Sequence, residues 1–187
     1  MRSTGRHAVL EVRGDLHAVD IEALTALLER GDAFFEGNPS VGRMLQTPPL
    51  LANIEHLSIF LSPLGKDEIA YLTAPERHID LPEFVTDVMR RKLLRRGRRQ
   101  KGELSLADLE NVETRARSAY RELQEAWHFQ YVIPNHDGED SEHWDAFYYT
   151  IGDARKALEA VAALLDGGSP PSVERWEQDL LPAEPAG

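Results

Sequence analysis

The stretch 105–165 constrains the fold more than any other part of the chain, because a long helical pattern, a β-rich run and a second helical pattern follow one another there. Apolar residues recur every three or four positions after a Ser-x-x-Asp start (Ser105, Asp108), which is typical of a helix capping box. The run FQYVI at 129–133 predicts a strand that ends at Pro134. Helices that alternate with single strands predict an α/β fold with a mainly parallel sheet flanked by helices.

Shorter patterns extend this alternation toward the N-terminus. The sequence predicts strands over 7–13, 33–35 and 57–61, and helices over 20–30, 66–72, from Leu81 into the basic segment as far as Gly97, and 153–165. Parallel sheets bind ligands where their strands end. The loops at 36–38, 62–63 and 134–138 are therefore the first places to look for a site.

Size and composition predict one folded domain. The 187 residues are 42% hydrophobic, enough for a core, and we expect a domain over 1–167 and a loosely attached Pro-rich tail over 168–187. The chain has no cysteine, which excludes disulfides, thiolate metal sites and a cysteine nucleophile. No apolar run approaches the roughly 20 residues that span a bilayer, and the N-terminus lacks a signal-peptide pattern. These features predict a cytoplasmic protein with no membrane partner.

Charge is distributed unevenly along the chain. The net charge of −11 argues against nucleic acid as a partner. Residues 90–101 nevertheless hold eight basic side chains and no acid, which leaves 13 basic residues against 32 acids elsewhere. This basic segment indicates a site for an anion, whether a phosphate, a nucleotide or an acidic surface of the same protein. A solvated helix end followed by a loop is the simpler alternative.

Four segments, taken in chain order, carry a family resemblance. They are 27–38 (LLERGDAFFEGN), 60–69 (FLSPLGKDEI), 95–98 (RRGR) and 115–135 (RARSAYRELQEAWHFQYVIPN). The first resembles a helix followed by a Gly-acid-Phe-x-Glu strand and a Gly-Asn turn, and the second a strand with its Pro-Pro-Ser turn. The third resembles the Arg-Gly of a lid, and the fourth a closing helix followed by a Tyr-Val-Ile-x-Asn strand. These are motifs of the guanylate kinase family of nucleoside monophosphate kinases. The resemblance spans most of 2–165 and implies a P-loop kinase-like fold, with an acceptor-nucleotide region at about 1–50 and a lid at about 82–104.

The resemblance also implies roles for individual residues. Arg96 and Arg115 would clamp the transferring phosphoryl group, for which the planar fork of arginine is well suited. Asn135 would approach the adenine of the donor, and ATP and Mg²⁺ are implied as donor and cofactor.

On the acceptor side, the ligand would be GMP or a similar nucleotide. Glu36 would accept hydrogen bonds from its base, Asn38 would form the binding turn, and Ser40, Arg2 and Arg6 would lie at its phosphate.

The chain departs from the family in one decisive respect. It contains no Gly-x-x-x-x-Gly-Lys-Ser/Thr, and the Arg2/Arg6 pair that follows this loop in the family stands at the start of the sequence. We therefore expect the first strand, the P-loop and its helix to be missing, and no autonomous kinase activity. Three interpretations remain: an enzyme fragment whose P-loop lies upstream, a non-catalytic nucleotide- or protein-binding module, or an α/β interaction domain whose basic segment docks on an acidic partner or on itself. The oligomeric state is left open.

Simpler roles remain for several of these residues. Arg115 has glutamates nearby and would then form a surface salt bridge, Glu36 would cap a turn, and Arg2 and Arg6 belong to a terminus. The segment HDGEDSEH at 136–143 is rich in metal-ligating residue types, but its spacing fits neither an EF-hand nor a zinc motif. We therefore predict no metal site, and interpret this segment as an acidic turn or a partner of the basic segment. The aromatic residues at 144–149 are expected to pack the 136–151 insertion onto the body of the domain.

Overall fold

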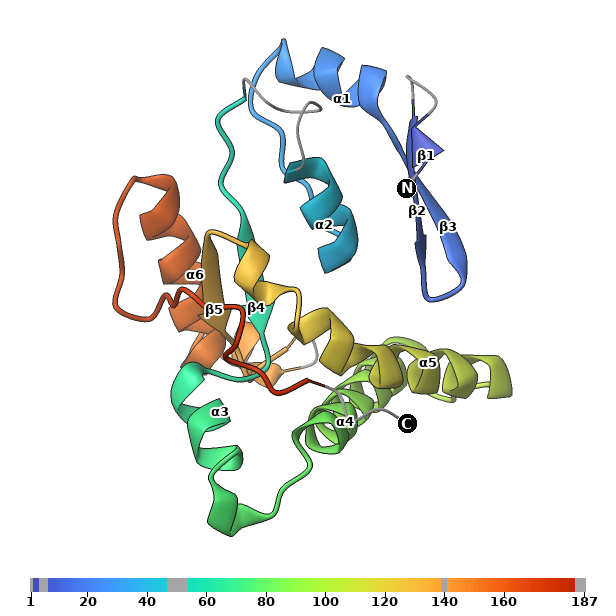
Figure 1. Ribbon diagram of the computed structural model, residues 1–187, viewed down its shortest axis with the longest axis vertical. Helices are drawn as coiled ribbons and strands as arrows, with labels where there is room; N and C mark the ends of the chain where they lie inside the picture. Colours follow the sequence, from blue (N-terminus) through green and yellow to red (C-terminus); the bar gives the residue numbers. More distant parts are fainter. Residues whose placement is uncertain (1, 4–6, 47–53, 139–140, 184–187) are drawn as a thin grey trace. The chain divides into compact units, whose positions relative to one another are not determined.

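The computed structural model describes residues 2–3, 7–46, 54–138 and 141–183. The chain forms two compact units, unit 1 (Met1–His56) and unit 2 (Leu57–Gly187), each with its own hydrophobic core (Figure 1). Within the described residues, unit 1 holds a three-stranded antiparallel sheet and unit 2 a two-stranded parallel sheet. The α/β character is confirmed. The predicted mainly parallel sheet is not found among the described residues, because only β4 and β5 pair in parallel and the larger sheet is antiparallel.

Unit 1 is built on a β-hairpin. Its strands β1 (Arg2–Ser3), β2 (His7–Val12) and β3 (Asp15–Asp20) pair in sequence order. Arg13 and Gly14 both have positive φ, 54° and 87°, as a tight two-residue hairpin turn requires. Two helices follow, α1 (Ile21–Leu28) and α2 (Pro39–Gln46). The apolar side chains that form the buried core of this unit are Ala8, Val12, Val41, Met44 and Leu45.

Unit 1 corrects the predicted strand over 33–35. These residues have no regular secondary structure, and no strand of the described part of the chain pairs with them. Phe34 is 91% exposed, so the apolar run is not held in a sheet. The structure adds β3 and α2, which the sequence did not predict. The first position of the β2–β3 turn is an arginine in the left-handed region, so the usual Asn-Gly or Asp-Gly hairpin pair is missing from the sequence. Leu16 of β3 is exposed, so the strand also lacks a clear alternation of buried and exposed residues.

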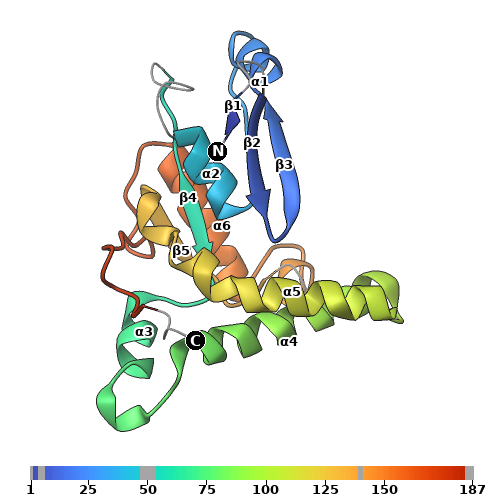
Figure 2. The same cartoon turned by 45° about the vertical axis from the view of Figure 1, so that its right-hand side comes forward.

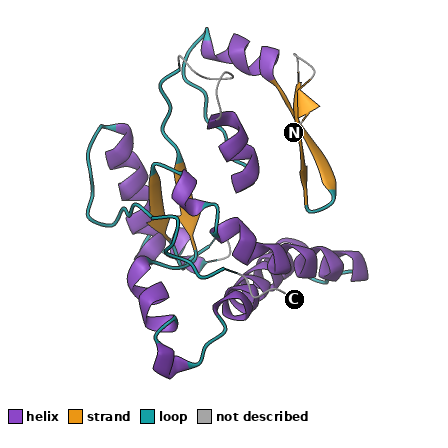
Figure 3. Cartoon of the chain, viewed as in Figure 1, coloured by secondary structure: helices purple, strands orange, loops and turns teal. Residues whose placement is uncertain are grey.

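Unit 2 is organised around two parallel strands, β4 (Ile59–Ser62) and β5 (Tyr131–Pro134), paired from Ile59↔Tyr131 to Ser62↔Pro134. Its helices are α3 (Lys66–Leu72), α4 (Leu81–Lys101), α5 (Leu106–Leu123) and α6 (Gly152–Leu165), with short 3-10 turns at Pro75–Arg77, Ala126–His128 and Glu142–Trp144. Figure 3 shows β4 and β5 as short arrows among helices and loops. No helix in the described ranges is both long and apolar enough to cross a bilayer.

Helices α4 and α5 form an antiparallel hairpin and lie side by side (Figure 2). The capping box at the start of α5 is confirmed, because Ser105 Oγ accepts from Asp108 N and the Asp108 carboxylate accepts from Ser105 N. The predicted interruption at Gly97 is wrong, since α4 continues to Lys101. Glycine within a helix costs only about 1 kcal/mol. Here it also makes room for Leu104, whose Cδ2 would lie 2.9 Å from a Cβ at position 97.

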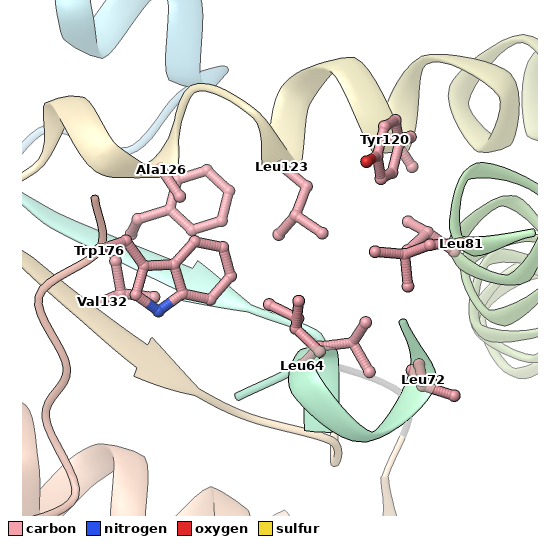
Figure 4. Close-up of a cluster of buried hydrophobic side chains, with 12 residues drawn as sticks. Leu64, Leu72, Leu81, Tyr120, Leu123, Ala126, Val132 and Trp176 are labelled. Atoms are coloured by element: carbon pink, nitrogen blue, oxygen red, sulfur yellow. The ribbon is translucent and has the colours of Figure 1, made fainter. Parts of the chain in front are cut away.

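The segment after Gly168 is part of the core and not a loosely attached tail. Glu174 pairs with Val132 of β5 through two backbone hydrogen bonds of 2.8 Å. Trp176 is 7% exposed and packs in the main cluster with Leu64 and Leu123 (Figure 4). The prolines prevent regular structure here, but they do not prevent packing. Trp176 anchors this segment in the core.

Candidate functional site

The candidate site is the edge of unit 2 at which both parallel strands end. Asn135 N donates to Ser62 O (2.8 Å), which holds the two strand ends together. Helix α3 begins close after β4, and the loop 135–151 leads from β5 to the start of α6. The edge therefore gathers two loops and two helix starts, the position where parallel sheets bind ligands.

His136 connects two helices at this edge. Its Nδ1 lies 2.5 Å from Asp153 Oδ2 on α6, and its Nε2 lies 2.8 Å from Glu68 Oε2 on α3. Partial burial of the imidazole opposes protonation, but the hydrogen bonds to Asp153 and Glu68 outweigh it and raise the pKa of His136. Hydrogen bonds from Lys156 and then from His136 lower the pKa of Asp153 to about 2.

Asp137 fastens the same loop to the first turn of α6. Its carboxylate accepts from Ala154 N (2.7 Å) and Ser141 Oγ (3.0 Å) and lies 2.7 Å from His143 Nδ1. Partial burial works against ionisation, yet these hydrogen bonds lower the pKa of Asp137. Gly152 supports this arrangement with φ +64°, and a Cβ there would collide with the His143 ring.

Basic side chains from α4 reach the same loop. Lys92 Nζ donates to Asn135 O (3.3 Å), and Arg99 donates to Asp145 Oδ2 (2.6 Å) and to Ser141 O (3.4 Å). The basic segment therefore contacts the loop 135–151 of its own chain, as one of the interpretations of the sequence predicted.

Other basic residues of the segment hold the helical hairpin together. Arg90 donates to Glu113 through Nε (2.8 Å) and Nη2 (3.1 Å), and Lys101 pairs with Asp108 across the end of the hairpin. Hydrogen bonds from Arg90 and then Arg117 lower the pKa of Glu113 to about 2. Much of the basic segment thus contributes to the structure of unit 2.

The predicted clamp arginines lie on the two helices of this hairpin, Arg96 on α4 and Arg115 on α5, and both are half-buried. Arg90 and Glu113 are level across the hairpin. At 1.5 Å per residue, this register places Arg96 and Arg115 about 12 Å apart along the hairpin axis. Asn135 lies at the strand edge, where its side-chain oxygen accepts from Asp137 N (3.0 Å).

The predicted acceptor residues belong to unit 1. Asn38 Oδ1 accepts from Ser40 N (2.9 Å), and Asn38 O accepts from the backbone amides of Val41 and Gly42, so the Gly-Asn turn is the start of α2. Asn38 Nδ2 is buried, and no partner for it is found among the described residues. Glu36 is exposed and follows an irregular segment, which corrects its expected place at the end of a strand. Arg2 belongs to β1, and Arg6 lies outside the described residues.

The residues present do not fit ATP and Mg²⁺. The chain has no phosphate-binding loop sequence, and the described residues contain no group of three or more His, Asp or Glu that could hold a metal ion. At His136, Asp153 and Glu68 contact opposite ring nitrogens, so these three side chains do not converge on one ion. Glu139 and Asp140, two of the acids in the 136–143 segment, lie outside the described residues.

The aromatic residues of the insertion correct a further prediction. Phe147, Tyr148 and Tyr149 are 62%, 108% and 62% exposed, so they are not buried against the body of unit 2, and the contact found is that of the Arg155 guanidinium of α6, 5.6 Å from the centre of the Tyr149 ring. Phe147 and Tyr149 stack on each other instead, with ring centroids 6.3 Å apart.

Sequence reasoning also missed Glu68 and Asp153 as partners of the loop. The available signal was a carboxylate in the first turn of each of the two helices that start near the strand ends.

No family model, curated protein or solved structure matches the chain. The resemblance to guanylate kinases therefore depends on the quoted motifs and their order alone.

Proposed function

We propose that this chain is a guanylate-kinase-like α/β module that binds a nucleoside monophosphate or a related anion and does not transfer phosphate by itself. The supporting observation is the arrangement of unit 2. The two segments that resemble the family's strands are adjacent and parallel, and the helical hairpin between them in sequence brings the basic segment to their carboxyl ends. The contact of Lys92 Nζ with Asn135 O, at 3.3 Å, is where segment and edge meet.

Chemistry favours an anion as the ligand of this edge. Lys92 and Arg99 reach the loop 135–151, and further arginines follow along α4. Guanidinium groups bind phosphate oxygens through paired, charge-assisted hydrogen bonds. In the proposal, a phosphate would compete with Asp145 for Arg99, and Arg96 and Arg115 would contribute from the hairpin. The acceptor residues that the resemblance implies, Glu36, Asn38, Ser40, Arg2 and Arg6, belong to unit 1, and the proposal for the edge of unit 2 does not depend on them.

Phosphoryl transfer is not part of the proposal for this chain. Catalysis of that reaction depends almost entirely on positioning and on electrostatic stabilisation of the phosphates. The glycine-rich cradle and its lysine, which supply most of both in P-loop kinases, are missing from the sequence.

A calorimetric titration of the full chain with GMP tests this proposal. We expect measurable binding, and an affinity about ten- to a hundredfold weaker for Arg115→Ala, as the loss of a charged hydrogen bond implies. Arg117→Ala is the matched control, since Arg117 lies on the same helix, is 75% exposed and pairs with Glu113. Equal affinity of Arg115→Ala and wild type, or ATP-dependent phosphorylation of GMP above background, would contradict the proposal.

A protein-binding module is the second candidate function. The three exposed aromatic side chains at 147–149 favour it, because aromatic residues are enriched at protein interfaces. Absence of affinity for nucleotides, together with salt-sensitive self-association, would favour this candidate over the first.

A further inference from the structure

We propose that His136 is a proton-operated clasp that joins α3 to α6 at the carboxyl edge of the β4–β5 sheet. This inference goes beyond the proposed function, because it depends only on the structure of unit 2 and holds whether or not the edge binds a nucleotide.

The geometry requires a proton. Both ring nitrogens of His136 face carboxylate oxygens, Asp153 Oδ2 at 2.5 Å and Glu68 Oε2 at 2.8 Å. A neutral imidazole has one N–H, so one nitrogen would present its lone pair to a carboxylate oxygen. The imidazolium donates to both oxygens at once. The observed contacts are therefore those of the charged ring.

The two carboxylates come from two different helices. Glu68 lies in the first turn of α3, where it also accepts from Gly65 N (2.8 Å). Asp153 lies in the first turn of α6 and is also bound by Lys156 Nζ (2.9 Å). His136 immediately follows Asn135, whose backbone N–H donates to Ser62 O at the end of β4. A single ring at this position therefore connects both helices to the sheet.

Charged groups from three elements surround the ring. Glu68 from α3 and Asp153 from α6 favour the imidazolium. The other charged groups of these elements are Asp137 on the same loop, Lys156, which donates to Asp153, and Lys92 of α4, which donates to Asn135 O. His143 is bound to Asp137. The His136 side chain is 46% exposed, so solvent protons reach it and the clasp responds to pH without unfolding.

The direction of the pH effect follows from the raised pKa of His136. The contribution to stability is fully present below the pKa of the unfolded chain and is lost as the pH rises through the pKa of the folded one. At high pH the neutral ring can donate to one carboxylate only, so His136 loses its hydrogen bond to either Glu68 of α3 or Asp153 of α6, while Asp137 still accepts from Ala154 N of α6.

A titration of the histidine rings by NMR, on the full wild-type chain, is the first test. Signals of His136 are assigned by their loss in His136→Gln. We expect His136 to titrate at higher pH than the same residue in an unstructured peptide of residues 132–138, with both ring nitrogens protonated below the midpoint. Titration at or below the peptide value would overturn the proposal, even if the variant itself fails to fold.

Amide hydrogen exchange supplies a local readout. After correction for intrinsic rates, we expect the first turns of α3 and α6 to exchange about two- to fivefold faster above the His136 midpoint than below it, the range of a partly exposed ion pair. Glu68→Gln retains an oxygen for Gly65 N but has no charge, and should lower the His136 midpoint. His143→Gln is the control, because the His143 ring contacts a different carboxylate, that of Asp137, and it should leave the His136 midpoint unchanged. An unchanged midpoint in Glu68→Gln, or exchange that does not follow the titration, would contradict a clasp.

Discussion

At the scale of single residues, the loop 135–151 is held by a few polar contacts that depend on one another. Asp137 accepts hydrogen bonds from Ala154 N at the start of α6 and from Ser141 Oγ of its own loop, and it lies 2.7 Å from His143 Nδ1. Gly152, the first residue of α6, makes this possible because only a residue without a Cβ leaves room for the His143 ring. The site therefore depends on a glycine as much as on its charged groups.

We expect Gly152→Ala to destabilise unit 2 by about 1–3 kcal/mol, because it combines a strained positive φ with a collision against His143 and Asp137. Urea denaturation measures this. Gly167→Ala is a matched control, since Gly167 also has positive φ (+77°) but open space around its Cβ position. Equal costs for the two variants would show that backbone strain alone matters and that the contact with His143 does not.

Local signals were predictable at this scale, and distant partners were not. Ser105 and Asp108 stand three residues apart, so their capping box could be predicted from the sequence. His136 meets Asp153 and Glu68, which are 17 and 68 residues away. Only the pairing of β4 with β5 brings those helix starts to one edge, and no local pattern encodes that pairing.

At the scale of elements, ion pairs between basic and acidic side chains join helices α4 and α5. Glu113 accepts hydrogen bonds from Arg90 across the hairpin and from Arg117 on its own helix. Its pKa of about 2 means that its contribution to stability is present above the usual glutamate pKa and is lost as the pH falls toward 2.

We therefore expect Glu113→Gln to unfold at lower urea concentration than wild type at neutral pH, with a difference that shrinks as the pH falls from about 4.5 to about 2. Parallel urea denaturation series, followed by circular dichroism, measure this difference. Glu110→Gln, an exposed position on the same helix, serves as control. If the two proteins still differed in stability at pH 2, the ion pair of Glu113 with Arg90 would not be the cause of the difference.

Elements with strong periodicity were predicted well, whereas those defined by a partner were not. Helices α3 and α6 match the predicted ranges closely, and α5 begins directly after the predicted Ser105 cap, because the apolar stripes of these helices face the core. The apolar residues 33–35 and Gly97 were misread for opposite reasons. The first lacks a neighbouring strand to pair with among the described residues. The second stays within α4, where the absence of a Cβ leaves room for Leu104 of the turn that precedes α5.

At the scale of the whole molecule, the segment after Gly168 completes the hydrophobic core of unit 2. Trp176, Leu180 and Leu181 pack against a cluster that includes residues of β4, α3, α4, α5 and β5. The Glu174 carboxylate accepts from Lys66 N, through both oxygens at 3.1 Å, and from Trp176 Nε1 (2.6 Å). The C-terminal segment therefore covers the free edge of β5 and the start of α3 together.

This arrangement makes the last tryptophan a determinant of the stability of unit 2. We expect Trp176→Ala to cost about 3–5 kcal/mol, because it removes a large buried side chain from the main cluster and leaves a cavity. Trp144→Ala, at a position 37% exposed, should cost about 1 kcal/mol or less. Chemical denaturation followed by circular dichroism compares the two without relying on tryptophan fluorescence. If both variants lost equally little stability, the segment after Gly168 would not belong to the cooperative core, and the closure of unit 2 by its own C-terminal segment would have to be abandoned.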